Sequence, residues 1–326
     1  MDRTKIDWCD STWNPVTGCL HGCEYCYARG IANRFGGWEF SPGSLRLNIA
    51  DEKTYIAPIK AYYGEVKETE YGKIAEINDP FIIRDKKAPY PFGFMPTFHR
   101  YRLNEYTDKK GRNIFVCSMA DLFGAWVPND WKIEVLEACK RAPQHNYLFL
   151  TKDTIGYSIW PTKKYKNFHE HEAYTENMWL GVTYTGRERL EGHYQDWEIG
   201  HSMSIWTNFW YLWRMSNTIL PTKAHKFISI EPLWCDICEV EDEREGGKLL
   251  ENFLLPRGYK SFFEWIIVGA ETGKRKDKVA PKREWIEKLV YLCKKAEIPI
   301  FMKSSLAEIW GEQLIQEFPE QLMRNK

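Results

Sequence analysis

Three cysteines near the start of the chain have the spacing of a metal-binding loop. Cys19, Cys23 and Cys26 follow a C-x3-C-x2-C pattern, and Gly18 and Gly22 stand directly before the first two of them. Glycine permits positive φ values and close backbone approach, so such a loop can fold back and direct three thiolates to one point. Three soft ligands in a short loop predict a metal or iron–sulfur site.

The remaining cysteines do not suggest disulfides. The total of nine is odd, and Met1 to Lys5 leads into no apolar segment typical of a signal peptide. No apolar run approaches the roughly 18 residues of a membrane span. We therefore expect a reducing, cytoplasmic setting and no membrane partner. Cys235 and Cys238 form a C-x2-C pair without a second pair, which is weak evidence for another metal.

The bulk composition is that of a globular protein. The chain has 326 residues, 44% of them hydrophobic and 28% charged, with 45 Lys+Arg against 45 Asp+Glu. Overall charge therefore does not indicate a nucleic-acid partner. A local basic segment, 274–278 followed by Lys282 and Arg283, predicts either a solvated loop or a phosphate-binding surface. Aromatic residues reach 15%, which favours core packing or ring stacking in a site.

The thiolates need a scaffold, and the rest of the sequence predicts a parallel sheet. Short, nearly continuous apolar runs alternate with amphipathic segments, a pattern typical of strands covered by helices. Seven such strands favour a barrel or open barrel of β/α units. The expected strands are 13–17, 113–119, 146–151, 178–183, 226–230, 265–269 and 300–302. The expected helices are 27–35, 129–142, 205–215, 283–296 and a helical tail, 306–323.

The chain divides into four segments in this interpretation. Residues 1–37 hold the first strand and the cysteine loop, and 38–94 form an irregular insertion or small lobe. Residues 95–305 form the remainder of the β/α barrel, and 306–326 form a C-terminal helical tail. The insertion has short β-like runs but no strong periodicity.

Polar residues follow several of the expected strands. The carboxyl ends of parallel strands meet at one mouth, so these side chains are expected beside the cysteine loop. For Asp121 and Thr183 a helix cap is the competing interpretation. The residues are Ser118, Asp121, Thr151, Lys152, Thr183, Glu231, Glu271, Lys303 and Ser304.

The cysteine loop resembles that of radical S-adenosylmethionine (radical SAM) enzymes, in which an aromatic residue, here Tyr25, precedes the third cysteine. The strings 14–19 (NPVTGC) and 21–29 (HGCEYCYAR) are similar to the branch of spore photoproduct lyase and DNA-repair-photolyase-like proteins. Further strings, spread in order over almost the whole chain, resemble a phage-associated, largely uncharacterised family of that branch. They are 115–123, 143–145, 150–152, 179–183, 230–233 and 268–273.

The resemblance implies an α/β fold of a partial (β/α)6-type barrel of parallel strands that binds a [4Fe–4S] cluster. Cys19, Cys23 and Cys26 would hold three irons, and the fourth iron would bind the amino and carboxylate groups of S-adenosylmethionine. One electron, from a reductant such as flavodoxin or ferredoxin, would cleave the sulfonium to methionine and a 5′-deoxyadenosyl radical. The competing metal is zinc, with Cys9 or His21 as the fourth ligand.

The resemblance also assigns roles to cavity residues. Lys152 would pair with the methionine carboxylate, Thr183 would bond the amino-acid part of the cofactor, and Tyr25 would touch the adenine. Ser118 and Asp121 follow a strand at which related enzymes bind the cofactor's ammonium group, although the usual Gly-Gly-Glu is absent here.

Three further residues are candidate catalytic groups. Spore photoproduct lyase has a hydrogen-donating cysteine near the strand end occupied here by Cys117. Adjacent strand residues face opposite ways, so Cys117 becomes a core thiol if Ser118 faces the cavity. Glu231 and Glu271 could bind ribose hydroxyls or act as general acid or base, or could form a cap or a structural ion pair.

The leading hypothesis is a radical SAM enzyme acting on a nucleic acid or a nucleotide-derived substrate. The competing hypotheses are radical modification of a peptide or small metabolite, and a non-catalytic iron–sulfur or zinc module that senses redox state or recruits a partner.

Overall fold

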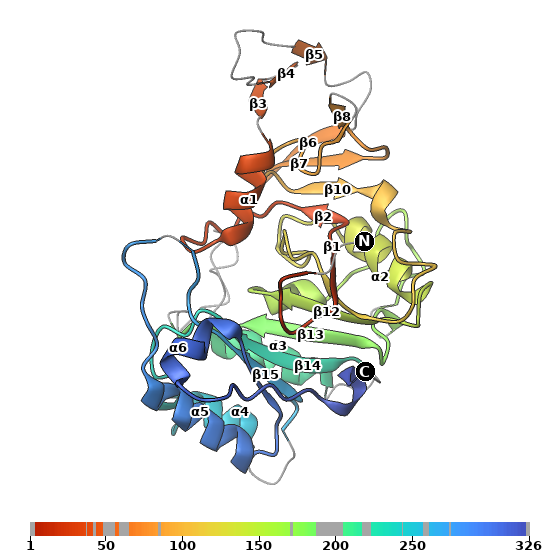
Figure 1. The fold of residues 1–326 in the computed structure, drawn as a ribbon. Coiled ribbons are helices and arrows are strands. Elements are labelled where there is room, and N and C mark those ends of the chain that lie inside the picture. Colours follow the sequence, from red (N-terminus) through yellow and green to blue (C-terminus); the bar gives the residue numbers. More distant parts are fainter. Residues whose placement is uncertain are drawn as a thin grey trace.

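A curled sheet of seven parallel strands forms the centre of the computed structural model (Figure 1), in the order β1-β11-β12-β13-β14-β15-β16. The structure describes residues 4–36, 38–41, 44–47, 56–58, 65–83, 86–169, 172–186, 205–216, 223–242, 244–256, 261–273 and 275–323. The strands are β1 (Ser11–Trp13), β11 (Asn113–Val116), β12 (Asn146–Thr151), β13 (Met178–Thr183), β14 (His225–Ile230), β15 (Trp265–Val268) and β16 (Ile300–Met302). The expected parallel α/β sheet of seven strands is confirmed, but its first strand is Ser11–Trp13 and not 13–17.

Both faces of this sheet are apolar, which explains why its strands have continuous apolar sequences. Alternate side chains of a strand point to opposite faces. In β11, Ile114 packs into the core beneath the helices, whereas Phe115 packs into a second cluster on the other face. This second cluster lies inside the curl, where Trp8 closes the space with its ring 4.7 Å from that of Phe115. Its other buried members are Leu148, Trp179, Phe227, Trp265, Ile267, Phe301 and Leu322.

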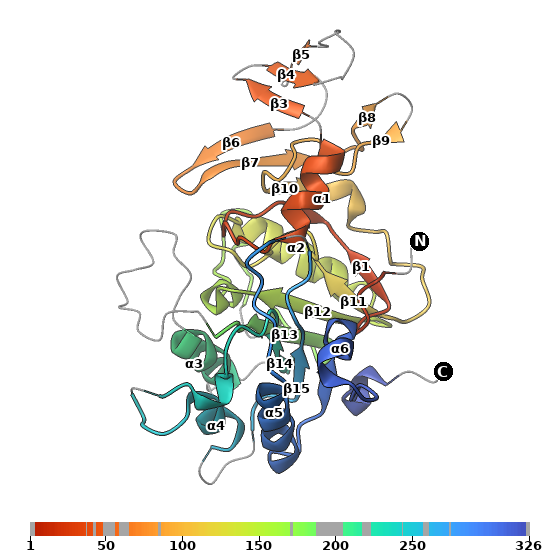
Figure 2. The ribbon, with the colours of Figure 1, turned by 60° about the vertical axis from the view of Figure 1, so that its left-hand side comes forward.

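Helices cover the outer face of the sheet (Figure 2). Residues from several of them, such as Leu136, Leu212 and Leu289, are buried in the same core as the outward-facing strand residues. In the described part of the chain, no helix has the length and apolar character needed to cross a membrane. The helices are α1 (Tyr27–Gly36), α2 (Asn129–Lys140), α3 (Ile205–Ser216), α4 (Leu249–Leu254), α5 (Arg283–Lys295) and α6 (Ala307–Trp310). The 3-10 turns are η1 (Arg100–Arg102), η2 (Thr154–Tyr157), η5 (Ile237–Glu239), η6 (Ser304–Leu306) and η7 (Glu320–Leu322).

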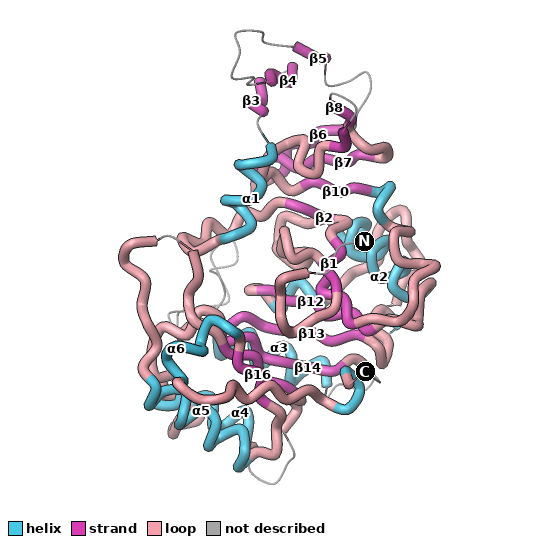
Figure 3. The backbone as a smooth tube through the Cα atoms, in the orientation of Figure 1, coloured by secondary structure: helices cyan, strands magenta, loops and turns pink. Residues whose placement is uncertain are grey.

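The segment between α1 and β11 forms a small lobe of β-structure beyond one end of the main sheet (Figure 3). Arg100 fastens this lobe to the main sheet, because its guanidinium lies 2.8 Å from Glu76 in the lobe and 2.8 Å from Glu134 in α2. The first lobe sheet has the order β2 (Val16–Thr17), β10 (Thr97–His99), β7 (Gly72–Ile77), β6 (Glu65–Thr69). The other strands are β3 (Trp38–Ser41), β4 (Ser44–Leu47), β5 (Ile56–Pro58), β8 (Ile82–Ile83) and β9 (Lys86–Lys87).

Two predictions about elements were wrong, and a third was right in part. The expected strand 13–17 is two strands, because the chain leaves the main sheet after Trp13 and β2 pairs with β10 of the lobe. The insertion 38–94 was expected as an irregular segment or small lobe with short β-like runs, and its described residues form lobe strands instead of an irregular segment. The expected tail helix ends at Trp310, where Gly311 takes a φ of 72°. The chain then runs beside β16, with Met302 donating to the carbonyl of Ile315.

Candidate functional site

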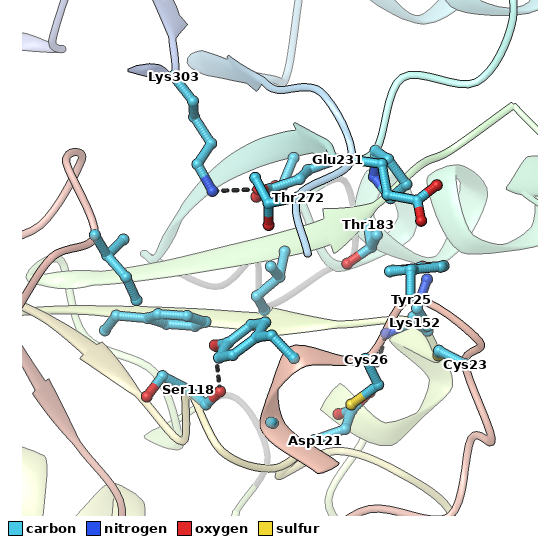
Figure 4. Close-up of a pocket in the computed structure, with 18 of the residues that line it drawn as sticks. Cys23, Tyr25, Cys26, Ser118, Asp121, Lys152, Thr183, Glu231, Thr272 and Lys303 are labelled. Atoms are coloured by element: carbon cyan, nitrogen blue, oxygen red, sulfur yellow. Dashed lines mark hydrogen bonds and ion pairs between the residues drawn. The ribbon is translucent and has the colours of Figure 1, made fainter. Parts of the chain in front are cut away.

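A cavity of about 400 Å³ opens at the carboxyl ends of the parallel strands. The cysteine loop lines it together with the loops that follow β11, β12, β14, β15 and β16, and residues 5–8 form its inner floor. Figure 4 shows how these side chains converge from separate elements. The predicted residues that line the cavity are Cys19, Cys23, Tyr25, Cys26, Ser118, Asp121, Thr151, Lys152, Thr183, Glu231, Glu271, Lys303 and Ser304.

The cysteine loop begins at a position where only glycine fits. Gly18 has a φ of 83°, and a Cβ atom there would lie 2.3 Å from the carbonyl oxygen of Met95. The Gly18 amide donates to the Met119 carbonyl at 2.9 Å, and the Cys19 amide donates to Phe94 at 3.3 Å. The loop is therefore held between the lobe and the end of β11, with α1 following directly after it.

The three thiols of the loop interact electrostatically. Burial raises the pKa of Cys19, and negative charge at Asp121, Cys23 and Cys26 raises it further. Burial also raises the pKa of Cys23, while the nearby Lys152 ammonium acts in the opposite direction. Negative charges at these thiols and at Asp121 would therefore oppose one another, and a positive charge nearby would relieve that repulsion.

The thiols do not form a closed site for one ion. Among the described residues, no three His, Cys, Asp or Glu side chains surround a point at which they could hold a metal ion. His21 Nε2 lies 2.7 Å from Asp121 Oδ2, and Cys9 is not among the cavity-lining residues. A zinc site would need His21 or Cys9 as its fourth ligand. His21 is hydrogen-bonded to Asp121, and the Cys9 thiol lies outside the cavity.

Asp121 is a buried anchor for the cysteine loop. Its Oδ2 accepts hydrogen bonds from Thr151 Oγ1 at 2.9 Å and the Lys152 amide at 3.0 Å, in addition to the bond with His21. Its Oδ1 accepts from the Phe123 amide at 3.0 Å. Burial by itself would raise the pKa of this carboxyl, but the bond to His21 and the other donors lower it below the usual range. The arrangement favours a positioning role rather than the predicted contact with the cofactor.

A stack of cations and aromatic rings joins the cysteine loop to the opposite rim. Lys152 Nζ lies 5.2 Å from the Tyr25 ring centroid, and the Tyr25 ring meets Trp234 edge-on at 5.0 Å. The guanidinium of Arg275 lies 5.5 Å from the Trp234 ring. Cation–π contacts of this kind stabilise a rim whose members come from different loops.

Glu271 is bound within the same rim. Arg275 donates to both of its carboxylate oxygens at 2.7 Å, and Trp234 Nε1 donates at 2.9 Å. These bonds, with the Arg275 bonds contributing most, lower the pKa of Glu271. The predicted carboxylate therefore lines the cavity as part of a structural ion pair.

Ser118 and Cys117 occupy opposite environments, although both lie beyond the end of β11 at Val116. Ser118 lines the cavity, and its hydroxyl donates to Asn14 Oδ1 at 3.2 Å. Cys117 is 2% exposed in the hydrophobic core, and burial raises the pKa of its thiol to about 12. Its φ of 56° ends β11. The placement of Cys117 as a candidate hydrogen donor is therefore corrected, because its thiol is buried away from the cavity.

Two side chains of the basic loop after Glu271, Arg275 and Lys278, are held by contacts within the protein. Lys274 lies outside the described residues. Arg275 lies 3.1 Å from Glu24 as well as contacting Glu271, and Lys278 donates to the Gly273 carbonyl at 2.9 Å. These contacts favour the structural interpretation of the loop over phosphate binding.

The sequence matches one protein family over residues 3–320, the family described as Protein of unknown function (DUF5131). The chain belongs to the DUF5131 family. No curated protein matches the chain. No solved structure matches it.

In this DUF5131 member, several cavity residues were not predicted from sequence. Trp8 lines the cavity, and Trp234 lies beside it against Tyr25. They are two of 15 tryptophans, and no local spacing distinguishes them from tryptophans that fill the core. Asp7 lies before the first strand, where no motif marks it. Glu231 and Lys303 were each predicted at the mouth of the cavity, because each follows an expected strand. The ion pair between them was not predicted.

Proposed function

We propose that this protein is a radical SAM enzyme that holds a [4Fe–4S] cluster with Cys19, Cys23 and Cys26. The observation that carries the proposal is that this C-x3-C-x2-C loop shares one cavity with Lys152 and Thr183 at the carboxyl ends of parallel strands. A chemical site at that end of a curled parallel sheet is the usual arrangement in β/α barrels. We further propose a nucleic acid or a nucleotide-derived compound as its substrate.

The donor set suits a cluster better than a single ion. In a [4Fe–4S] cluster each thiolate binds a different iron, so the sulfurs need not converge on one point. The Arg29 amide lies 3.4 Å from Cys26 Sγ and can donate to it, and hydrogen bonds to sulfur are one of the ways in which proteins tune such clusters. All nine cysteines are free thiols, which agrees with the reducing cytoplasm we propose as its location.

When bound, the cluster and S-adenosylmethionine supply reductive cleavage of the sulfonium and a 5′-deoxyadenosyl radical that takes a hydrogen atom from the substrate. Lys152 would offer its ammonium to the methionine carboxylate, and Thr183 would offer a hydroxyl. Asp121 would hold the cysteine loop against β12 through His21. Trp8 and Phe115 would exclude water from the floor.

Formation of 5′-deoxyadenosine tests the proposal. Anaerobically reconstituted protein would be mixed with dithionite and S-adenosylmethionine, and the product measured by chromatography. Cys23→Ala should abolish formation because it removes an iron ligand. Cys9→Ala is the matched control, and it should retain formation because Cys9 does not line the cavity. Equal amounts of product from wild type and Cys23→Ala would reject the proposal.

A further inference from the structure

The cavity has a second polar end, formed by Glu231 and Lys303. Their side chains form an ion pair, and they remain 27% and 17% exposed because they face the cavity. Figure 4 shows this pair across the cavity from Cys26 and Ser118. Glu231 follows β14 and Lys303 follows β16, with β15 between them, so the sheet itself brings the two charges together.

Part of the cavity lining is apolar and aromatic. Trp8, Phe115 and Leu150 line the cavity, and Trp8 and Phe115 are 3% and 8% exposed. Ser229 also lines the cavity and is 1% exposed. In the described part of the chain, its hydroxyl has no hydrogen-bond partner. A buried hydroxyl without a partner normally indicates a group that a ligand or water satisfies.

Two cations near this end, Lys303 and Arg275, are already paired with carboxylates, which argues against a phosphate bound by either of them. Lys303 is neutralised by Glu231, and Arg275 is neutralised by Glu271 and Glu24. A phosphate would have to break one of these pairs and leave a carboxylate beside it. The second end of the cavity thus suits a neutral ligand with both a donor and an acceptor.

We propose that Glu231 and Lys303 bind the substrate, and that the substrate carries a neutral planar heterocycle with an N–H group beside a carbonyl, as in uracil or guanine. Lys303 Nζ donates to the carbonyl, and a Glu231 oxygen accepts from the adjacent N–H. The ring lies against the apolar floor at Trp8 and Phe115. This inference rests on the proposed function only in taking the cavity as the reaction site.

The Glu231–Lys303 ion pair explains why a ring edge with a carbonyl beside an N–H group would be selected. A paired ammonium and carboxylate present a donor directly beside an acceptor, which complements the carbonyl and N–H of a lactam or imide edge. Methylation of that nitrogen replaces the donor with a bulky apolar group and leaves Glu231 without its partner. Sites built around such hydrogen bonds reject analogues that lack them far more strongly than apolar pockets do.

Ligand binding to the full-length protein as purified tests this inference. Uridine and guanosine are the probes, 3-methyluridine and 1-methylguanosine are the blocked comparators, and binding is measured by saturation-transfer NMR and calorimetry. At least one probe should bind wild type, and methylation should weaken its binding at least 10-fold. Lys303→Met and Glu231→Gln should each weaken it by a similar factor. Lys295→Met, which removes an exposed ion pair with Glu251, is the matched control and should bind as wild type does.

A charge-exchanged double variant separates recognition from folding. Glu231→Lys combined with Lys303→Glu keeps an ion pair and should keep the melting temperature. It reverses donor and acceptor and should lose guanosine binding, because N1–H of guanine has a carbonyl on one side only. The inference is overturned if neither probe binds wild type, if methylated and unmethylated probes bind equally, or if the exchanged variant binds guanosine normally. It is also overturned if S-adenosylhomocysteine displaces the probe, because the pair would then serve the cofactor. None of these measurements depends on 5′-deoxyadenosine formation.

Discussion

Replacing Asp121 with asparagine should loosen the cysteine loop from the sheet. Two carboxylate oxygens now accept from four donors, three of which converge on Oδ2, and the residue is 5% exposed. Asparagine has the same shape but offers one oxygen and an NH2 group. Whichever way the amide turns, at least one buried donor faces another donor.

The expected loss is about 3 kcal/mol in the free energy of unfolding. Leaving a buried donor unsatisfied costs about 1–3 kcal/mol, and the remaining bonds lose the strength that a charged acceptor gives them. The pKa of Asp121 is lowered from its usual value of 3.8, so the ionised carboxylate stabilises the fold at pH values above 3.8. This contribution should disappear as the pH falls through the folded-state pKa.

Urea unfolding of wild type and Asp121→Asn at pH 7 and at pH 3 would measure this difference. Asp277→Asn, an exposed change on the rim loop, is the control and should differ from wild type by less than about 0.5 kcal/mol. Asp121→Asn should also retain less iron after reconstitution. A variant as stable as wild type at pH 7, with full iron content, would refute the anchoring role.

Three other changes give distinct results. Burial and repulsion from Asp121 raise the pKa of Asp153 to about 6. Its ionisation therefore opposes folding progressively above pH ~4 and fully above pH ~6. Asp153→Asn should raise the free energy of unfolding by about 2 kcal/mol at pH 8 and leave it unchanged below pH ~4. A loss of stability at pH 8 would contradict this. Gly18→Ala should lose iron binding, because its Cβ would strike the Met95 backbone. Gly22→Ala should keep most of the iron binding, because a Cβ there has nothing within 4 Å. Equal iron contents in the two variants would disprove the steric argument. Lys152→Ala should weaken S-adenosylmethionine binding roughly 10- to 100-fold in calorimetry, as loss of a charge-assisted bond predicts; unchanged affinity would remove the carboxylate assignment.

The parallel sheet could be predicted because its strands are buried on both faces. The run 178–183 (MWLGVT) is buried throughout, and such a run is recognisable without knowledge of its neighbours. The same reasoning placed Lys152, Thr183 and Glu231 at one mouth, since parallel strands bring their carboxyl ends together.

The parts of the fold and site that could not be predicted depend on contacts between distant parts of the chain. The tail has helical periodicity, but Gly311 ends its helix and the following residues pair with β16. The lobe strands are short, and β2 finds its partner β10 about 80 residues away in sequence. Within the site, Trp234 reaches Tyr25 only because two loops converge. Local patterns carry no information on that convergence.

The central claim is that three cysteines hold a cluster whose remaining iron is open to S-adenosylmethionine. The most direct measurement is electron paramagnetic resonance of the anaerobically reconstituted, dithionite-reduced protein before and after adding S-adenosylmethionine. We predict a [4Fe–4S]⁺ signal whose g values shift on addition, and its loss in Cys23→Ala. A wild-type protein without that signal, or with a signal that S-adenosylmethionine leaves unchanged, would contradict the account.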